Sequence, residues 1–270
     1  MQASGNLKRL DEYLSARAGR GLCIAFSGGV DSALLLACAA KAGGKVVAVT
    51  LHSPLHSPGE PGEAAGLAKS LGVKHRVISI DGIPDGILDN PPNRCYLCKK
   101  ELFVKIFDLA ESEGLGYVMD GTNGDDLNVY RPGRWALKEL GVLSPLAELG
   151  LTKAQVRAMA ESLGLKVASK PSAPCLATRF PYGARLSEEN MAKAEKLEST
   201  IKEMGIPVVR ARIYGETVRL EVLPENFEKI LTAREKLTDI AKSLGFLYTT
   251  LDIEGFRTGS MDLAIDTSEQ

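Results

Sequence analysis

Two hydrophobic patterns alternate along the first part of the chain. Short, continuously apolar runs are typical of buried strands, and longer stretches with a 3.6-residue period are typical of helices. The apolar run 22–26 is followed by Ser-Gly-Gly and then by the Ala- and Leu-rich stretch 31–42. Further strands are predicted at 45–51, 73–80 and 116–119, and further helices at 60–71, 93–113 and 152–163. This alternation predicts an α/β domain, in which a parallel sheet has helices on both faces.

The pattern changes after residue 169. Residues 170–186 carry three prolines and indicate an ordered loop or linker. We therefore expect three parts: an α/β domain at 1–169, a Pro-rich loop or linker at 170–186, and a small α+β domain at 187–270. In the last part, helices are predicted at 187–204 and 224–244, and strands at 208–213, 217–222 and 246–253.

Composition narrows the class of protein. The 270 residues are enough for roughly two domains, and 44% hydrophobic with 25% charged residues is typical of a globular chain. No apolar stretch approaches the ~20 residues that cross a bilayer, and the N-terminus has no apolar signal core, so we expect a cytoplasmic protein without a membrane partner. The 33 Lys and Arg nearly balance the 34 Asp and Glu, which disfavours nucleic acid as a partner.

The turn between the first predicted strand and helix has the composition of a phosphate loop. Glycines let the backbone approach an anion, and N–H groups at a helix start attract negative charge. A carboxylate in such a loop makes sense if Mg²⁺ bridges it to phosphates. The alternative is an ordinary helix start capped by Ser and Asp. The candidate nucleotide ligands are Ser27, Gly28, Gly29, Val30, Asp31 and Ser32.

In this strand-loop-helix setting, SGGVDS resembles the pyrophosphate loop of the PP-loop ATP-pyrophosphatases. That resemblance implies a Rossmann-like α-hydrolase fold. It also implies that the enzyme cleaves ATP to AMP and pyrophosphate, with Mg²⁺, and activates a substrate oxygen as an adenylate. The loop identifies the superfamily and leaves the substrate open.

Three of the five cysteines are candidates for metal or sulfur chemistry. Cys95 and Cys98 form a CxxC pair, and Cys175 lies in the Pro-rich loop. Three thiols suit a 4Fe-4S cluster with one iron left open. An incidental pair on a helix and an inert loop thiol are the alternatives. Cys23 and Cys38 lie in a predicted strand and helix, and we expect both to be small core residues.

Eight segments spread along the chain carry a more specific resemblance. They begin at Ser27 (SGGVDS), Asn93 (NRCYLCK), Asp120 (DGTNGDD), Arg131 (RPG), Ser144 (SPL), Lys170 (KPSAPCLATRFPYG), Val209 (VRARIYGETVRLE) and Leu251 (LDIEGFRTGS). Together they resemble the LarE family, the pyridinium-3,5-biscarboxylic acid mononucleotide sulfurtransferases. In that family ATP adenylates a substrate carboxylate and sulfur displaces AMP, giving a thiocarboxylate for the nickel-pincer cofactor of lactate racemase. One subgroup sacrifices a cysteine matching Cys175, and another holds a cluster with three cysteines. The CxxC here favours the cluster form, with Cys175 and Asp31 as catalytic residues.

Polar residues elsewhere are assigned mainly through this resemblance. The segment after the fourth predicted strand lies at the sheet edge where α/β folds bind ligands, although a solvated Asx turn is the alternative. Arg210 and Arg212 share one face of a predicted strand and could hold a substrate phosphate, or simply form a polar outer face. The resemblance places Gly121, Thr122 and Asn123 in the nucleotide pocket, with Asp126 assisting Mg²⁺ or positioning Arg131.

The expected partners are a small nucleotide substrate, sulfide or another sulfur donor, and other nickel-pincer biosynthesis proteins. The family also suggests a homo-oligomer, either a trimer or a hexamer. Two other functions stay open: a cluster-dependent tRNA thiolase, and a non-redox ligase of the amidotransferase type. The first would bind tRNA with a salt-sensitive basic surface, and the second would tolerate serine at all three cysteine positions.

Overall fold

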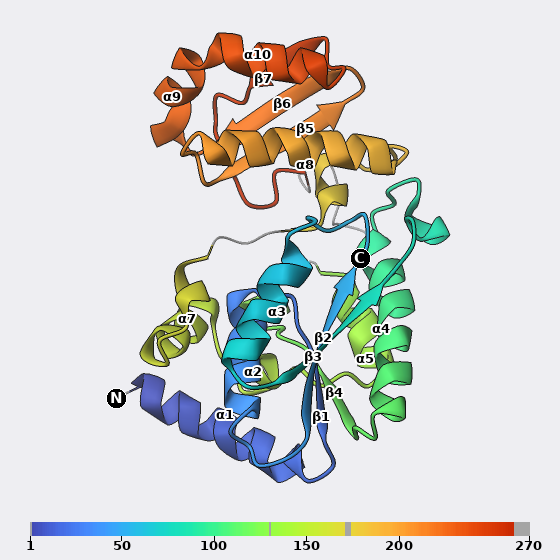
Figure 1. The fold of residues 1–270 in the computed structure, drawn as a ribbon, viewed down its shortest axis with the longest axis vertical. Helices are drawn as coiled ribbons and strands as arrows, with labels where there is room; N and C mark the ends of the chain where they lie inside the picture. The colour runs from blue at the N-terminus through green and yellow to red at the C-terminus, as the bar shows by residue number, and fades with distance from the viewer. Residues whose placement is uncertain (1, 130, 171–173, 262–270) are drawn as a thin grey trace. The chain divides into compact units, whose positions relative to one another are not determined.

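The computed structural model describes residues 2–129, 131–170 and 174–261, and the chain divides into two compact units (Figure 1). The second unit takes in two short segments, 54–57 and 82–92, from the part of the sequence expected to form the first domain. The first unit comprises Met1–Ser53, Pro58–Asp81 and Asn93–Ala173, and the second comprises Pro54–Ser57, Gly82–Pro92 and Pro174–Gln270.

The first unit is built on a four-stranded parallel sheet in the order β3-β2-β1-β4. Because β2 and β4 lie on opposite sides of β1, the loops that leave β1 and β4 meet where the strand order reverses, which is the usual ligand site of such sheets. The predicted α/β class is confirmed. The strands are β1 (Leu22–Ala25), β2 (Val46–His52), β3 (Lys74–Ser79) and β4 (Tyr117–Met119).

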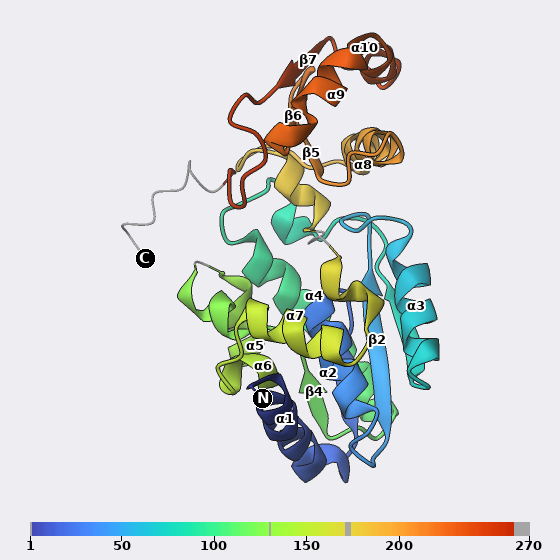
Figure 2. The same cartoon turned by 90° about the vertical axis from the view of Figure 1, so that its left-hand side faces the viewer.

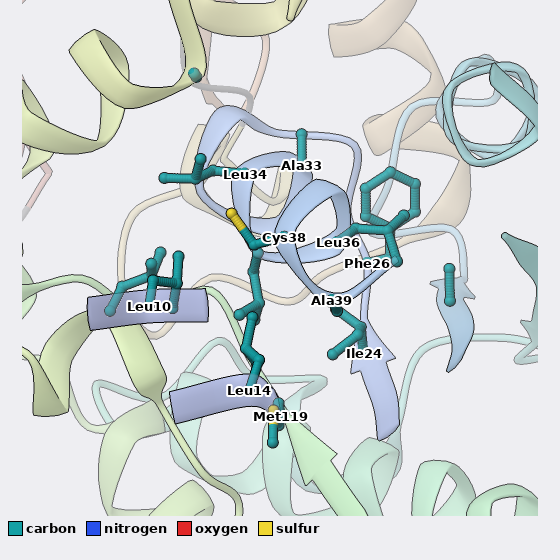
Figure 3. Close-up of a cluster of buried hydrophobic side chains, with 14 of the residues drawn as sticks. Leu10, Leu14, Ile24, Phe26, Ala33, Leu34, Leu36, Cys38, Ala39 and Met119 are labelled. Carbon is teal, nitrogen blue, oxygen red and sulfur yellow. The ribbon is translucent and has the colours of Figure 1, made fainter. Parts of the chain in front are cut away.

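Helices cover both faces of this sheet (Figures 1 and 2). Side chains alternate along β1, so that Leu22 and Ile24 point to one face and Cys23 to the other. The first face packs against α1, α2, α3, α6 and α7 (Figure 3), and the second against α4 and α5. The helices are α1 (Gln2–Ala18), α2 (Val30–Ala39), α3 (Glu60–Ser70), α4 (Arg94–Ser112), α5 (Gly133–Glu139), α6 (Pro145–Glu148) and α7 (Lys153–Ser162).

The second unit contains a three-stranded sheet in the order β5-β6-β7, with β5 antiparallel and β7 parallel to β6. The single helix predicted at 224–244 is wrong. A short 3₁₀ turn at Pro224–Asn226 precedes two helices, and the chain leaves the helical conformation between them at Ala233 (φ −90°, ψ 9°). The elements are α8 (Glu188–Glu203), β5 (Val209–Tyr214), β6 (Thr217–Val222), α9 (Phe227–Thr232), α10 (Arg234–Ser243) and β7 (Tyr248–Leu251).

Within the described residues, no helix combines the length and the apolar character that a membrane span requires.

Candidate nucleotide site

The candidate phosphate loop joins β1 to α2, as the sequence predicts. Gly28 adopts a left-handed conformation (φ 70°), which a residue with a Cβ takes up only at a cost. The hydroxyl of Ser32 donates to the carbonyl of Gly29 (3.1 Å), and Ser27 Oγ lies 3.3 Å from Ser32 Oγ. The N–H of Gly29 donates to Ser27 Oγ (3.4 Å). The loop is therefore held by its own hydroxyls at the start of α2, where N–H groups favour an anion.

Three segments far apart in the sequence meet at Asp31. Its carboxylate accepts a hydrogen bond from Asn123 Nδ2 (3.2 Å), which lies beyond the end of β4, and forms an ion pair with the ammonium of Lys153 at the start of α7. Thr152 caps that helix through a reciprocal bond with Gln155, so the position of Lys153 is fixed by its own helix start. The sequence analysis predicted this helix but did not identify Lys153 as part of the site.

The segment after β4 packs directly against the phosphate loop. A Cβ on Gly121 would lie 2.8 Å from the backbone nitrogen of Ser32, so only glycine fits there. The carboxylate of Asp120 is buried and accepts hydrogen bonds from Thr122 Oγ1 (2.5 Å) and Ser144 Oγ (2.6 Å). These bonds hold the segment at the carboxyl end of the sheet, beside the phosphate loop. A solvated turn, the alternative considered from the sequence, does not describe the buried carboxylate of Asp120.

Asp126 has two structural roles in this segment. Its Oδ2 accepts from the backbone N–H of Asn123 (3.1 Å), which closes a capping box, and its Oδ1 pairs with Arg131 Nη1 (3.1 Å). Of the two roles expected for Asp126, the structure shows the pairing with Arg131.

The cysteines fall into two groups by exposure. Cys23 and Cys38 are buried, as predicted, and burial raises the pKa of each thiol to about 12. Cys95 is exposed and Cys98 partly exposed, three residues apart in the first turn of α4, whereas Cys175 belongs to the second unit. Across the described residues, no three His, Cys, Asp or Glu side chains are grouped so that they could hold a metal ion.

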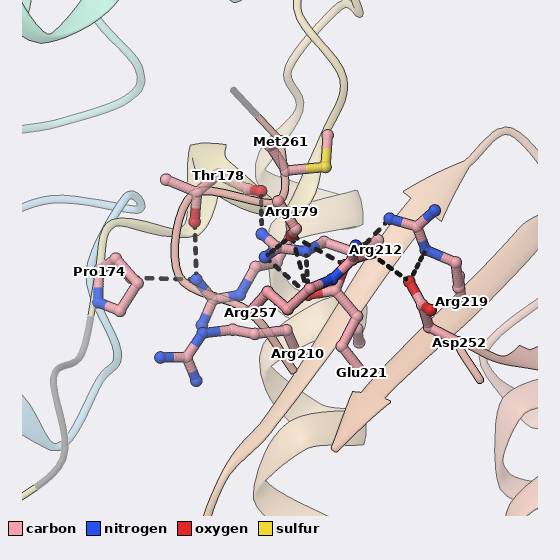
Figure 4. Close-up of polar contacts among 12 residues, drawn as sticks. Pro174, Thr178, Arg179, Arg210, Arg212, Arg219, Glu221, Asp252, Arg257 and Met261 are labelled. Carbon is pink, nitrogen blue, oxygen red and sulfur yellow. Dashed lines mark hydrogen bonds and ion pairs between the residues drawn. The ribbon is translucent and has the colours of Figure 1, made fainter. Parts of the chain in front are cut away.

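The second unit contains a cluster of charged side chains with a buried centre (Figure 4). Arg212 donates to Glu221 through Nε (3.0 Å) and Nη2 (2.8 Å), and its Nη1 donates to the carbonyl of Thr178 (2.6 Å). Glu221 also accepts from Arg219 (2.9 Å) and from the hydroxyl of Ser260 (3.0 Å), a residue to which the sequence assigned no role. The arginine face predicted on β5 is therefore not a solvated outer face.

Positive charge exceeds negative charge in this cluster. Burial and the neighbouring charge of Arg179 lower the pKa of Arg210 to about 10. Arg179 itself forms a buried bidentate pair with Glu198 (2.6 and 2.8 Å). Among the described residues, five guanidiniums and one ammonium therefore meet four carboxylates, and the members are Arg179, Arg210, Arg212, Arg219, Arg257 and Lys202 with Glu198, Glu221, Asp252 and Glu254.

Comparison with known proteins places the chain in a family. The family model described as NAD synthase matches residues 4–94. An uncharacterized protein of Synechocystis sp. is 39% identical and covers 88% of this chain and 91% of its own length. The pyridinium-3,5-bisthiocarboxylic acid mononucleotide synthase of Lactiplantibacillus plantarum is 36% identical and covers 88% of each chain. This chain belongs to the family of that synthase, LarE.

The LarE family thus stands within the ATP-using PP-loop enzymes, as SGGVDS indicated. The solved structure of an NMN synthetase from Francisella tularensis has a similar fold, with a TM-score of 0.52 at 20% identity. That likeness covers 64% of this chain and 76% of the other, and at this identity it speaks for the fold alone.

Proposed function

We propose that this protein is an ATP-dependent sulfurtransferase acting on pyridinium-3,5-biscarboxylic acid mononucleotide. It would adenylate a substrate carboxylate and replace AMP with sulfur, giving a thiocarboxylate for nickel-pincer cofactor synthesis. The similarity to the synthase of L. plantarum, over 88% of both chains, supports the substrate. The observation that carries the chemistry is the meeting of Asp31, Asn123 and Lys153 at the phosphate loop.

The first step is attack of a substrate carboxylate oxygen on the α-phosphorus of ATP, with breakage of the bond to pyrophosphate. The N–H groups of the loop at Gly28 and Gly29 and the ammonium of Lys153 would stabilise the negative charge on the departing pyrophosphate. Asp31 fits Mg²⁺, because this ion binds nucleotides through one or two protein carboxylates together with the phosphates. When bound, Mg²⁺ would neutralise charge on the phosphate oxygens.

The second step is attack of a sulfur nucleophile on the acyl carbon of the adenylate, with AMP as leaving group. We propose Arg210 and Arg212 as the residues that hold the substrate phosphate during both steps. The excess of guanidiniums over carboxylates around them supports an anionic ligand. Glu221 orients the guanidinium of Arg212 from the neighbouring strand. A phosphate would also offset the burial that lowers the pKa of Arg210.

The proposed sulfur source is a 4Fe-4S cluster held by Cys95, Cys98 and Cys175. The donor chemistry fits, since such clusters are bound by thiolates and three ligands leave one iron open for an exogenous sulfide. Cys95 and Cys98 offer two thiols from one helix turn. The steps above do not depend on the cluster, and sacrificial transfer of the Cys175 sulfur is the alternative source.

Product analysis tests the reaction first. Incubation with ATP, the dicarboxylate mononucleotide and sulfide should give AMP, pyrophosphate and a product in which sulfur replaces one oxygen, as seen by mass spectrometry. AMP formation without sulfur incorporation into any carboxylate would reject the proposed transfer.

Iron and acid-labile sulfide, with electron paramagnetic resonance, test the sulfur source on protein purified without oxygen. We expect about four iron atoms per chain. They should be lost in Cys95→Ser and retained in the control Cys38→Ala, whose thiol is buried in the core. A folded, iron-free wild type that forms dehydroalanine at Cys175 after one turnover would replace the cluster by the sacrificial route.

A further inference from the structure

Asn90 has an unusual backbone conformation for its position. It is fully buried (0% exposed), and its φ of 48° lies in the left-handed region, where it is the one non-glycine among the described residues. Asparagine tolerates this region better than most residues, but glycine would occupy it at less cost. We therefore expect the side chain of Asn90 to make contacts that glycine could not make.

Those contacts are hydrogen bonds donated by the side-chain amide of Asn90. Its Nδ2 donates to the backbone carbonyls of Pro181 (2.8 Å), Phe180 (3.1 Å) and Ala177 (3.4 Å), sharing two N–H groups among three acceptors. Among the described residues, no donor reaches Oδ1 of Asn90. The contribution of this side chain thus lies in its N–H groups and not in its oxygen.

The three carbonyls lie within and directly after the short turn that follows Cys175. Cys175 is the residue before the 3₁₀ turn η4 (Leu176–Arg179), and its carbonyl accepts from Thr178 Oγ1 (2.8 Å). The backbone of Asn90 adds a bond to the same segment, because its carbonyl accepts from the N–H of Gly183 (3.2 Å). One buried residue therefore holds the segment after Cys175 through both its side chain and its backbone.

We propose that Asn90 is a positioning residue for Cys175, fixing the orientation of the thiol by holding the carbonyls of the following turn. This inference rests on the proposed function only for its catalytic consequence. The structural part of the proposal is independent of that function: the amide of Asn90, in the segment Gly82–Pro92, sets the reactivity of Cys175 and does not affect the other four cysteines.

The test compares alkylation rates of the individual cysteines on the full chain, after iron is removed with a chelator. Peptide mass spectrometry after iodoacetamide treatment gives the rate at each thiol. Asn90→Gly keeps the left-handed backbone and removes the amide, so we expect the rate at Cys175 to rise at least fivefold. Cys95 and Cys98 should react as in the wild type, and Cys23 and Cys38 should stay protected.

Asp89→Asn is the matched control. It lies beside Asn90 and removes an ion pair with Arg185 (2.9 Å) whose side chains are 67% and 75% exposed, so it should leave every rate unchanged. A rate at Cys175 in Asn90→Gly within twofold of the wild type would overturn the proposal. If that variant exposes Cys23 and Cys38, Asn90→Ser carries the test. It keeps one donor and should give a smaller increase, and a wild-type rate there also overturns the proposal.

The catalytic consequence is measured separately. Asn90→Gly should lower the rate of thiocarboxylate formation at least tenfold and leave ATP–pyrophosphate exchange with the substrate within twofold, because adenylation does not use the thiol. A purely structural role would lower both rates together and would contradict the assignment. If the wild type forms no thiocarboxylate, the proposed function fails and the alkylation rates still decide the role of Asn90.

Discussion

Replacing Gly121 by alanine tests whether the segment after β4 and the phosphate loop form one site. The added Cβ would lie 2.8 Å from the nitrogen of Ser32 and 3.1 Å from its Cα, and both atoms belong to the first turn of α2, beside the proposed phosphate site. An ordinary carbon contact needs about 3.5 Å. The loop must therefore move by roughly 0.7 Å, because a backbone cannot rotate away as a flexible side chain can.

The cost of such overpacking is about 1–3 kcal/mol. If the displacement falls on the phosphate loop, the loss appears in ATP binding, where each 1.4 kcal/mol raises the Kd about tenfold. We expect Gly121→Ala to raise the Kd for ATP by about tenfold or more and to lower the free energy of unfolding by about 1–3 kcal/mol. Titration calorimetry and urea unfolding measure the two quantities.

Gly66→Ala is the matched control, since a Cβ on this α3 residue would meet nothing within 4 Å. It should leave ATP binding unchanged and stabilise the helix by up to about 1 kcal/mol. The reasoning is refuted if Gly121→Ala binds ATP within twofold of the wild type and unfolds like the control. That result would mean that the two segments are not packed together at the phosphate loop.

Three further substitutions probe single charges. Lys153→Met should raise the Kd for ATP about tenfold, because it removes a cation at the phosphate loop, and unchanged titration calorimetry would count against a phosphate role. Glu221→Gln should lower the free energy of urea unfolding by about 3 kcal/mol, since the carboxylate is buried between Arg212 and Arg219; a loss under about 1 kcal/mol would contradict the pairing. Hydrogen bonds from Lys74, then Lys45 and Arg76, lower the pKa of Glu113 to about 2, so its stabilising effect is present above pH 4.5 and is lost as the pH falls toward 2. Urea unfolding of Glu113→Gln should therefore approach the wild type across that window, and a constant difference would contradict the shift.

The sequence predicted the strands of the first unit and its helices α2, α3, α4 and α7 because their signals are local. An apolar run, two glycines and a capping pair at Thr152 and Gln155 each act within a few residues. The single helix expected at 224–244 failed for the complementary reason. The apolar period of this segment is continuous, and no glycine or proline near Ala233 indicates that the helix breaks there.

The site was only partly predictable because its contacts are long-range. Asp31 and Lys153 are 122 positions apart, and no pattern in the sequence around either residue indicates that the two side chains meet. The alternation that placed Arg210 and Arg212 on one face was correct. It did not show that Glu221 would be paired with Arg212, because that contact depends on the β5–β6 register, which sets Glu221 opposite Arg210 and next to Arg212 diagonally.

The ion pairs divide into those that a ligand can replace and those that it cannot. The side chains of Lys153 and Asp31 remain 32% and 19% exposed, so water and ions reach the pair, and exchange of its partners for Mg²⁺ and phosphate costs little. Those of Arg212 and Glu221 are 5% and 0% exposed, and separating them would leave a buried, unpaired charge at about 3–5 kcal/mol. ATP binding at the first site should therefore exchange partners, whereas an anion at the second should add to pairs that stay intact.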